Sequence, residues 1–273
     1  MLKLTKENYF SVEADKEYMS NSQMKGFIEC EAKKMAQLDG IYPKEDSQAF
    51  LQGRYVHSWN EGTMLQFEAE NPSMISSMGK TKGQLKKEFK KCGDAIEVLK
   101  SDPLIIKALE GQKEIIFTAD LFGTKWKCML DSYNPEQGRF ADLKYLKSFY
   151  DKFWNKEESY YENVFEYYGY YQQLSVYAEI ERIATKREGW LEPFLVMVDK
   201  QEIPDKMIMS FTSEDENYTD FIARNLTIIE YKLPRILKVK NKEVEPIRCE
   251  KCDYCRSTKM LTGTTHYSKL AMY

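Results

Sequence analysis

The chain has 273 residues, of which 42% are hydrophobic and 30% charged, enough to fill the core of one large domain. Lysine and arginine number 40 against 43 aspartate and glutamate, so the net charge of −3 excludes a chain that is basic throughout. No stretch is apolar for long enough to cross a bilayer, and the first ten residues lack the features of a secretory signal. We therefore expect a cytoplasmic protein without a membrane partner.

The N-terminal part is predicted to be helical from about residue 20 to 100. Ser20 and Gln23 have capping-box spacing ahead of apolar positions, which predicts an amphipathic helix carrying Cys30. A second helix, at about 50–65, carries His57. Because the sequence contains no repeat, low-complexity tract or linker, we expect a single domain over 1–273, with a cysteine-containing tail at about 240–273.

Two segments have a strong local excess of basic residues. Six lysines and one acid lie between 80 and 91, and seven basic residues and three acids lie between 232 and 251. Both segments could contact a phosphate backbone, but such runs more often form a solvated helix face, which is the interpretation we prefer.

Strands are predicted from Lys113 onward. Two β-prone runs flank Phe122 and Gly123 and predict a hairpin. In its second arm, alternation places Asp131 on the face of the lysines at 125 and 127, opposite the apolar side. After a turn at 134–138, a third strand at 139–146 directs Asp142 and Lys144 to the same face.

The remaining elements alternate between helix and strand. A tyrosine-dense helix is expected at about 158–184, where Gln173 and Tyr177 share a face. Strands at 193–199 and 206–211 precede a helix that a capping box at Ser213 opens and Pro234 ends. This order predicts a mixed α/β (α+β) fold, a central sheet flanked by helices.

Asp131, Asp142 and Lys144 form a candidate catalytic group. Phosphodiester hydrolysis needs a divalent cation, hard oxygen ligands and a group that orients water. A tight turn joins the strands that bear the two aspartates, so both can converge on one ion, while Lys144 projects beside Asp142. An Asp-x-Lys sequence alone is common and is usually surface decoration; the spacing from Asp131 is what favours catalysis.

These residues resemble the PD-(D/E)xK nuclease pattern, with MLD giving the first acid and ADLK the acid-x-lysine. The resemblance implies a restriction-endonuclease-like core in which Asp131, Asp142 and the backbone carbonyl of Leu143 bind Mg²⁺ or Mn²⁺. Lys144 would orient or partly deprotonate the attacking water.

Further motifs resemble RecB-type and RecE-like nucleases. LQGRYVH resembles their Gly-x-x-x-His element, which implies that His57 is a metal ligand; by itself, a lone histidine is more often a core or surface residue. QLSVY resembles their Gln-x-x-x-Tyr element, which implies that Gln173 and Tyr177 hold a phosphate or terminal nucleotide, although Tyr177 could simply pack on the sheet. Glu114 matches an acid on the first strand that supports the metal or the lysine.

The resemblance extends over about 20–259 and is strongest to RecE-like phage exodeoxyribonucleases. It implies 5′ to 3′ hydrolysis of linear double-stranded DNA in phage or prophage recombination in a bacterial cell. It also implies a ring-like homo-oligomer and a single-strand annealing partner. The alternatives are an iron-sulfur nuclease acting on single strands and a non-catalytic DNA-binding or recombination partner protein with a nuclease fold.

The six cysteines do not indicate disulfides in a reducing compartment. Cys92 and Cys128 are isolated and are interpreted as small buried hydrophobes.

The other cysteines suggest a metal. Cys249, Cys252 and Cys255 have the C-x2-C-x2-C spacing of a cubane [4Fe-4S] cluster. The helix bearing Cys30 resembles that of RecB- and AddB-type iron-sulfur nucleases, which implies a fourth ligand, although their tail spacing is C-x2-C-x5-C. Structural zinc and four unligated thiols remain alternatives.

Overall fold

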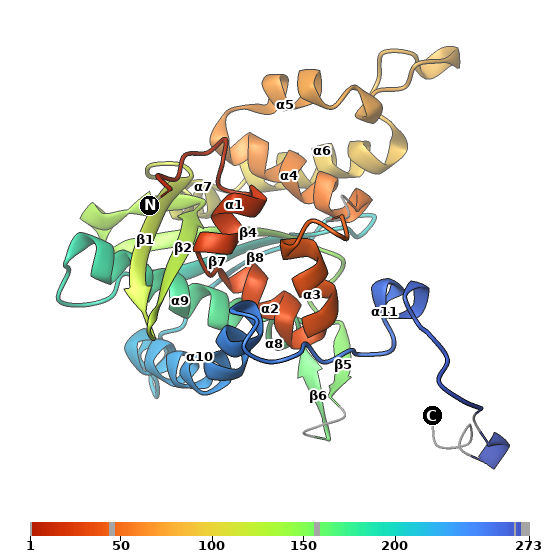
Figure 1. The fold of residues 1–273 in the computed structure, drawn as a ribbon. Helices are drawn as coiled ribbons and strands as arrows, with labels where there is room; N and C mark the ends of the chain where they lie inside the picture. Colours follow the sequence, from red (N-terminus) through yellow and green to blue (C-terminus); the bar gives the residue numbers. More distant parts are fainter. Residues whose placement is uncertain (1, 44–46, 156–158, 265, 269–273) are drawn as a thin grey trace. The chain divides into compact units, whose positions relative to one another are not determined.

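The computed structural model describes residues 2–43, 47–155, 159–264 and 266–268 (Figure 1). The chain forms two compact units. Unit 1 consists of Met1–Asn21 and Glu45–Leu233, and unit 2 of Ser22–Lys44 and Pro234–Tyr273. Each unit is therefore assembled from two separate stretches of sequence.

The N-terminal third is helical, as predicted. Its helices are α1 (Val12–Glu17), α2 (Asn21–Glu29), α3 (Glu31–Leu38), α4 (Gln48–Glu61), α5 (Met64–Glu70), α6 (Lys87–Lys100) and α7 (Pro103–Ala108), with 3-10 turns η1 (Pro72–Met74) and η2 (Gly79–Thr81). Helix α1 was not predicted. Cys30 does not lie inside a helix as expected: it is the N-cap of α3, and its sulfur accepts a hydrogen bond from the Lys33 amide.

A central mixed sheet organises unit 1, which confirms the predicted fold class. It contains β3 (Ser132–Asn134), β4 (Arg139–Leu146), β7 (Glu192–Asp199) and β8 (Lys206–Met209), in that spatial order. Strands β4 and β7 are parallel, whereas the outer pairs are antiparallel. Two hairpins are separate from this sheet: β1 (Ile115–Leu121) with β2 (Thr124–Leu130), and β5 (Lys152–Asn155) with β6 (Tyr160–Asn163).

The hairpin of β1 and β2 turns where the sequence predicted. Phe122 (φ 51°) and Gly123 (φ 76°) both adopt the left-handed conformation that a two-residue hairpin turn requires. The prediction that Lys127 lies on a polar face of β2 was wrong, because this residue is only 1% exposed. Its ammonium lies 2.7 Å from Asp15 Oδ1, because the N-terminal segment, which no strand pattern could reveal, covers this face.

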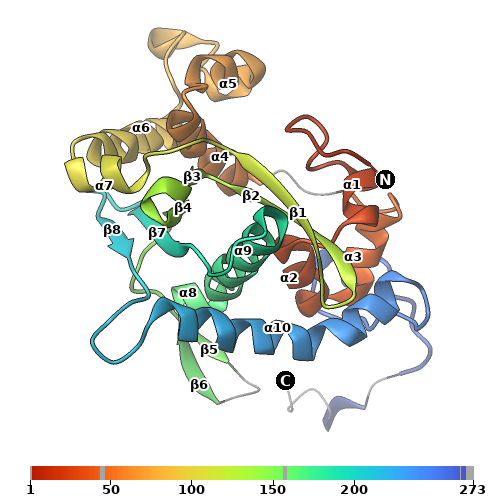
Figure 2. The same cartoon turned by 90° about the vertical axis from the view of Figure 1, so that its left-hand side faces the viewer.

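Helices cover both faces of β4 and β7. Ala141 and Leu143 of β4 join Val196 and Val198 of β7 in an apolar core with residues of α4, α6 and α7. Helix α9 (Tyr170–Thr185) packs against β7 and against the β1–β2 hairpin (Figure 2). Since side chains alternate along a strand, Asp142 and Lys144 project away from the apolar core and toward α9.

The tyrosine-rich segment is only partly helical. Its predicted start at Glu158 lies outside the described residues; the chain then forms β6, the short helix α8 (Val164–Tyr167) and α9. Asn163 caps α8 through a capping box with Glu166, and Gly169 (φ 68°) separates the two helices. The segment was predicted as one continuous helix, but the local capping residues divide it into separate elements.

Helix α10 (Tyr218–Lys240) contradicts the prediction that Pro234 ends it. The Ser213 hydroxyl accepts bonds from the amides of Asp215 and Glu216, as the capping box suggested, but the helix begins at Tyr218. Pro234 lies inside the helix, because buried Ile236 and Val239 continue its apolar face. Beyond it lies the short α11 (Asp253–Ser257). Among the described residues, no helix is long and apolar enough to span a bilayer.

Candidate active site

Asp131, Asp142 and Lys144 meet on one side of β4. Asp131 follows directly after β2, and its Oδ2 accepts a 2.7 Å hydrogen bond from the amide of Leu143. Asp142 is 3% exposed, and its Oδ2 lies 2.6 Å from Lys144 Nζ. The end of one hairpin and the middle of the sheet thus supply two carboxylates and an ammonium to a single site.

His57 reaches this site from α4. Its Nδ1 lies 3.4 Å from Asp131 Oδ1. One helical turn further on, Asn60 Nδ2 donates to the backbone carbonyl of Asp131 at 3.1 Å. Helix α4 therefore holds both the side chain and the main chain of Asp131, and it brings the predicted histidine beside the predicted acids.

The charges of the site depend on one another. Burial raises the pKa of Asp142 above its ordinary value, and the like charge of Asp131 adds to the effect. Burial also acts on Asp131, but His57 and Lys144 outweigh it and hold the pKa of that carboxyl low. Burial disfavours the ammonium of Lys144, yet Asp142 and Asp131 raise its pKa. Two buried carboxylates thus compete for positive charge.

Gln173 and Tyr177 of α9 lie next to Asp142. Gln173 Nε2 donates to Asp142 Oδ1 at 2.9 Å and to the Tyr177 hydroxyl at 3.0 Å. Burial raises the pKa of Tyr177 well above its ordinary value, so its phenol stays protonated. The Gln-x-x-x-Tyr element therefore lies beside Asp142, and the expectation that it holds a phosphate or terminal nucleotide stays a prediction.

Glu114 was expected to support the metal or the lysine, and the contacts that the structure describes for it are with Lys6 and Glu61. Its Oε2 forms a 2.9 Å ion pair with Lys6. It also neighbours Glu61, the last residue of α4, and burial together with the hydrogen bond to Glu114 raises the pKa of Glu61 to about 7. This pair of acids lies one helical turn from His57.

Three residues of this neighbourhood were not identified from the sequence: Asn60, Glu61 and Lys113. Lys113 Nζ donates to Asn60 Oδ1 at 2.8 Å and to Ser132 Oγ at 2.9 Å. Helical spacing was the available signal for Glu61, which lies four residues after His57. No short-range sequence pattern identified Lys113, because its side-chain partners Asn60 and Ser132 come from α4 and β3.

Part of the lysine run at 80–91 lines a pocket in unit 1. Lys87 and Lys91 of α6 border a cavity of about 260 Å³, together with Lys200. Lys200 Nζ lies 4.6 Å from the centre of the Tyr145 ring and donates to Gln52. The other lysines of the run are exposed to solvent, as expected of a solvated face.

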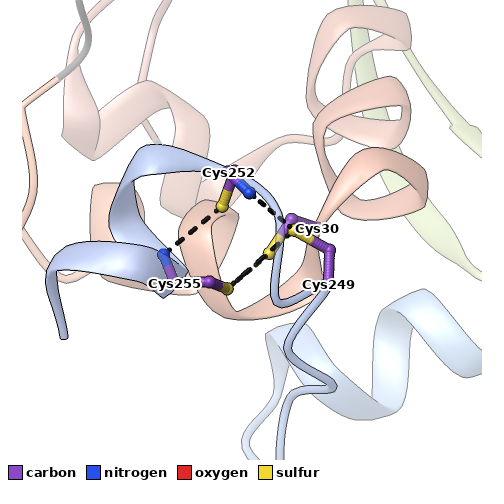
Figure 3. A group of neighbouring side chains, drawn as sticks. All are labelled: Cys30, Cys249, Cys252 and Cys255. Carbon is purple, nitrogen blue, oxygen red and sulfur yellow. Dashed lines mark hydrogen bonds between the residues drawn. The ribbon is translucent and has the colours of Figure 1, made fainter. Parts of the chain in front are cut away.

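The four predicted cysteines come together in unit 2 (Figure 3). The sulfur atoms of Cys30, Cys249, Cys252 and Cys255 all lie within 4.8 Å of one another. Cys30 Sγ is 3.5 Å from Cys255 Sγ, which is 3.9 Å from Cys249 Sγ. Residues more than two hundred positions apart thus form one thiol cluster. Cys92 and Cys128 are buried elsewhere, as predicted.

Backbone amides point at these sulfurs. Cys249 Sγ accepts from the amides of Lys251 and Cys252, and Cys252 Sγ accepts from that of Cys255. Burial disfavours the thiolate of Cys249, but the amides outweigh it and lower its pKa to about 6. Burial instead raises the pKa of Cys252 to about 12. The backbone amides therefore favour the thiolate at Cys249 over that at Cys252.

Comparison with known proteins places this arrangement in a family. Residues 20–258 match the model of a PDDEXK-like domain of unknown function, DUF3799. A crystal structure of a candidate exonuclease from Eubacterium rectale is similar over 99% of this chain and 98% of that one, with 38% identity and a TM-score of 0.88. Among curated proteins, none matches. The match covers both the β4 site and the four cysteines, and the chain therefore belongs to the PDDEXK-like DUF3799 family.

Proposed function

We propose that the protein is a metal-dependent exodeoxyribonuclease that hydrolyses linear double-stranded DNA from the 5′ end. The observation that carries this proposal is the group on β4: Asp131 bonded to the Leu143 amide, next to the Asp142–Lys144 ion pair. Similarity over the whole chain to a candidate exonuclease supports the same activity.

The donor set fits a hard divalent cation such as Mg²⁺ or Mn²⁺. Asp131 and Asp142 offer carboxylate oxygens and His57 an imidazole nitrogen. In a strand, the amide and the carbonyl of one residue point to the same side, so the Leu143 carbonyl faces Asp131 as its amide does. These four groups would hold the ion, which when bound polarises the scissile phosphate and makes water more acidic.

The remaining residues position these groups. Lys144 Nζ, held by Asp142, orients the attacking water. Gln173 is a positioning residue, because its amide fixes the Asp142 carboxylate from α9. Asn60 does the same for Asp131 through the main chain. We assign Glu114 no direct contact with the reacting atoms.

The test is to incubate linear duplex DNA, labelled at the 5′ or the 3′ end, with the protein and Mg²⁺. We expect early release of the 5′ label by the wild type and no degradation by Asp142→Ala. Lys144→Ala should slow cleavage at least about a hundredfold. The matched control is Lys147→Ala, because the Lys147 side chain is 82% exposed, and it should cleave normally. A Lys144→Ala protein as fast as wild type would rule out the assigned role.

The C-x2-C-x2-C spacing is the basis of a second candidate function, an iron-sulfur nuclease acting on single strands. We propose that the four thiols hold a structural metal centre. The sulfur contacts of 3.5 and 3.9 Å fit one tetrahedral zinc ion, whose Zn–S bonds of about 2.3 Å bring its ligands to this range. The C-x2-C-x2-C spacing instead resembles that of a cubane cluster.

Anaerobic purification decides between the two metals. A brown protein with visible thiolate-to-iron absorbance supports the cluster and the second candidate. A colourless protein with one zinc per chain supports the tetrahedral ion. A protein containing neither metal would contradict the proposed centre.

By the same resemblance, we propose that the protein acts in phage or prophage recombination in the bacterial cytoplasm, as a ring-like homo-oligomer beside a single-strand annealing protein. Sedimentation of the purified protein and co-purification with such a protein test these two points. A monomer with no bound partner would contradict both. A non-catalytic DNA-binding role is disfavoured because Asp131, Asp142 and Lys144 are all present, with Asp142 and Lys144 paired and Asp131 bonded to the residue between them.

A further inference from the structure

A continuous series of aromatic rings leads away from the candidate active site. Lys144 Nζ lies 5.1 Å from the centre of the Tyr170 ring. Tyr170 stacks on Tyr168 with the ring centres 5.8 Å apart, and the ring centres of Tyr168 and Phe153 of β5 are 5.9 Å apart. Phe153 is also stacked on Tyr167, at 3.8 Å with the rings 10° apart. Aromatic contacts thus connect the catalytic lysine to the β5–β6 hairpin.

The hairpin has two different faces. Register pairs Trp154 with Tyr161, so both project to one face, while Phe153 projects to the other and packs on the rings of Tyr167 and Tyr168. The ring centres of Trp154 and Tyr161 are 5.0 Å apart, and the two residues are 52% and 64% exposed. This outer face therefore presents large rings to solvent.

The composition of the segment is unusual for a generic apolar patch. Between 147 and 171 the only aliphatic residue is Val164, and it is buried. The exposed hydrophobic residues there are all tyrosine or tryptophan. Flat rings without aliphatic neighbours suit ligands that are themselves flat, because nucleobases stack on aromatic faces whatever their sequence.

Charge supports the same ligand. Lys152 is exposed and, by alternation, shares the outer face with Trp154 and Tyr161. Glu162 lies on the opposite face, where it accepts a hydrogen bond from Asn155. In the described strands β5 and β6, the outer face therefore carries a cation and no acid, which suits a phosphate backbone.

We propose that the outer face of strands β5 and β6, with Trp154, Tyr161 and Lys152, is a stacking surface for unpaired bases of the DNA strand that enters the active site. The ligand class is single-stranded DNA, bound through its bases and one backbone contact. The inference deepens the proposed nuclease function and rests on it for the identity of the strand. It assigns to this segment a role separate from packing on the sheet.

Binding is measured without cleavage, in EDTA, by the fluorescence anisotropy of a labelled oligothymidylate. Stacking contributes about 1–3 kcal/mol per base, so the double variant Trp154→Ala, Tyr161→Ala should bind at least about tenfold more weakly. The double variant Trp154→Phe, Tyr161→Phe keeps two rings and should restore most of the affinity. Tyr231→Ala on α10 is the control, since Tyr231 is 84% exposed but lies outside the segment.

Unchanged affinity in the double alanine variant would overturn the proposal. So would weaker binding accompanied by dissociation of an oligomer in sedimentation, because the face would then be a contact between copies. The two proposals fail separately. If the wild type degrades no labelled duplex in Mg²⁺, the proposed nuclease function is wrong. If the double alanine variant nevertheless binds more weakly in EDTA, the stacking surface is still supported.

Discussion

Glu61 and Glu114 place two carboxyl groups side by side at the end of the helix that carries His57. Their mutual hydrogen bond requires a proton, which is why burial and Glu114 raise the pKa of Glu61 from 4.5 to about 7. An acid whose pKa is raised by folding stabilises the protein less as the pH rises. The free energy of unfolding should therefore fall between about pH 4.5 and pH 7.

Glu61→Gln tests this coupling. The amide keeps a hydrogen bond to Glu114 but cannot ionise, so the variant should be more stable than wild type at pH 8 and similar to it at pH 4.5. After solvent screening, we expect a difference of about 1–2 kcal/mol at pH 8. Thermal unfolding in metal-free buffer measures it. An equal difference at both pH values would show that the two acids do not share a proton.

Residues that act through local spacing were predictable, whereas residues that act through distant contacts were not. Asp142 and Lys144 share a face because strand geometry places them there, and the sequence is enough to show it. Lys113 and Asn60 bind each other across more than fifty residues. Their meeting depends on how α4 packs beside β3, which no local pattern encodes.

Among the elements, α10 is the clearest failure of a sequence rule. A proline removes one amide and crowds the preceding turn, yet the helix continues for six residues past Pro234 to Lys240. Buried Ile236 and Val239 explain why, since their apolar face compensates for the lost hydrogen bond. The prediction of a helix where β6 lies failed for a different reason, because tyrosines are compatible with both a helix and a strand.

Pro234→Ala should consequently stabilise the protein. Alanine is favoured over proline by about 3 kcal/mol inside a helix, and the freer unfolded chain takes back about 1 kcal/mol, so we expect a net gain of about 2 kcal/mol. Urea unfolding measures the gain. Pro103→Ala is the matched control: Pro103 occupies the first turn of α7, where its missing amide costs nothing, and its replacement should give no gain.

At the scale of the whole molecule, the two units differ in what stabilises them. Unit 1 has an extensive apolar core around β4 and β7. The cysteine cluster of unit 2 packs with little apolar material: Ala32 and Tyr254 accompany the thiols. A metal bound there would supply much of the local stability.

Cys255→Ala should accordingly loosen unit 2 alone. We expect faster amide hydrogen exchange in α3 and α11, with β4 and β7 unchanged, and the same pattern when a chelator strips metal from the wild type. Cys92→Ala, which opens a cavity in unit 1, should leave α3 and α11 unaffected. Equal exchange of α3 and α11 in Cys255→Ala and wild type would show that the thiols have no structural role.

The division of unit 2 into two stretches has a consequence for biosynthesis. Helices α2 and α3 precede the three cysteines that complete the thiol cluster with Cys30 by about two hundred residues of chain. Until those cysteines are synthesised α3 lacks its partners, while all residues of unit 1 precede them in the chain. Metal capture should therefore follow the synthesis of Cys249, and a chain released before that residue should hold a folded unit 1 with an incomplete unit 2.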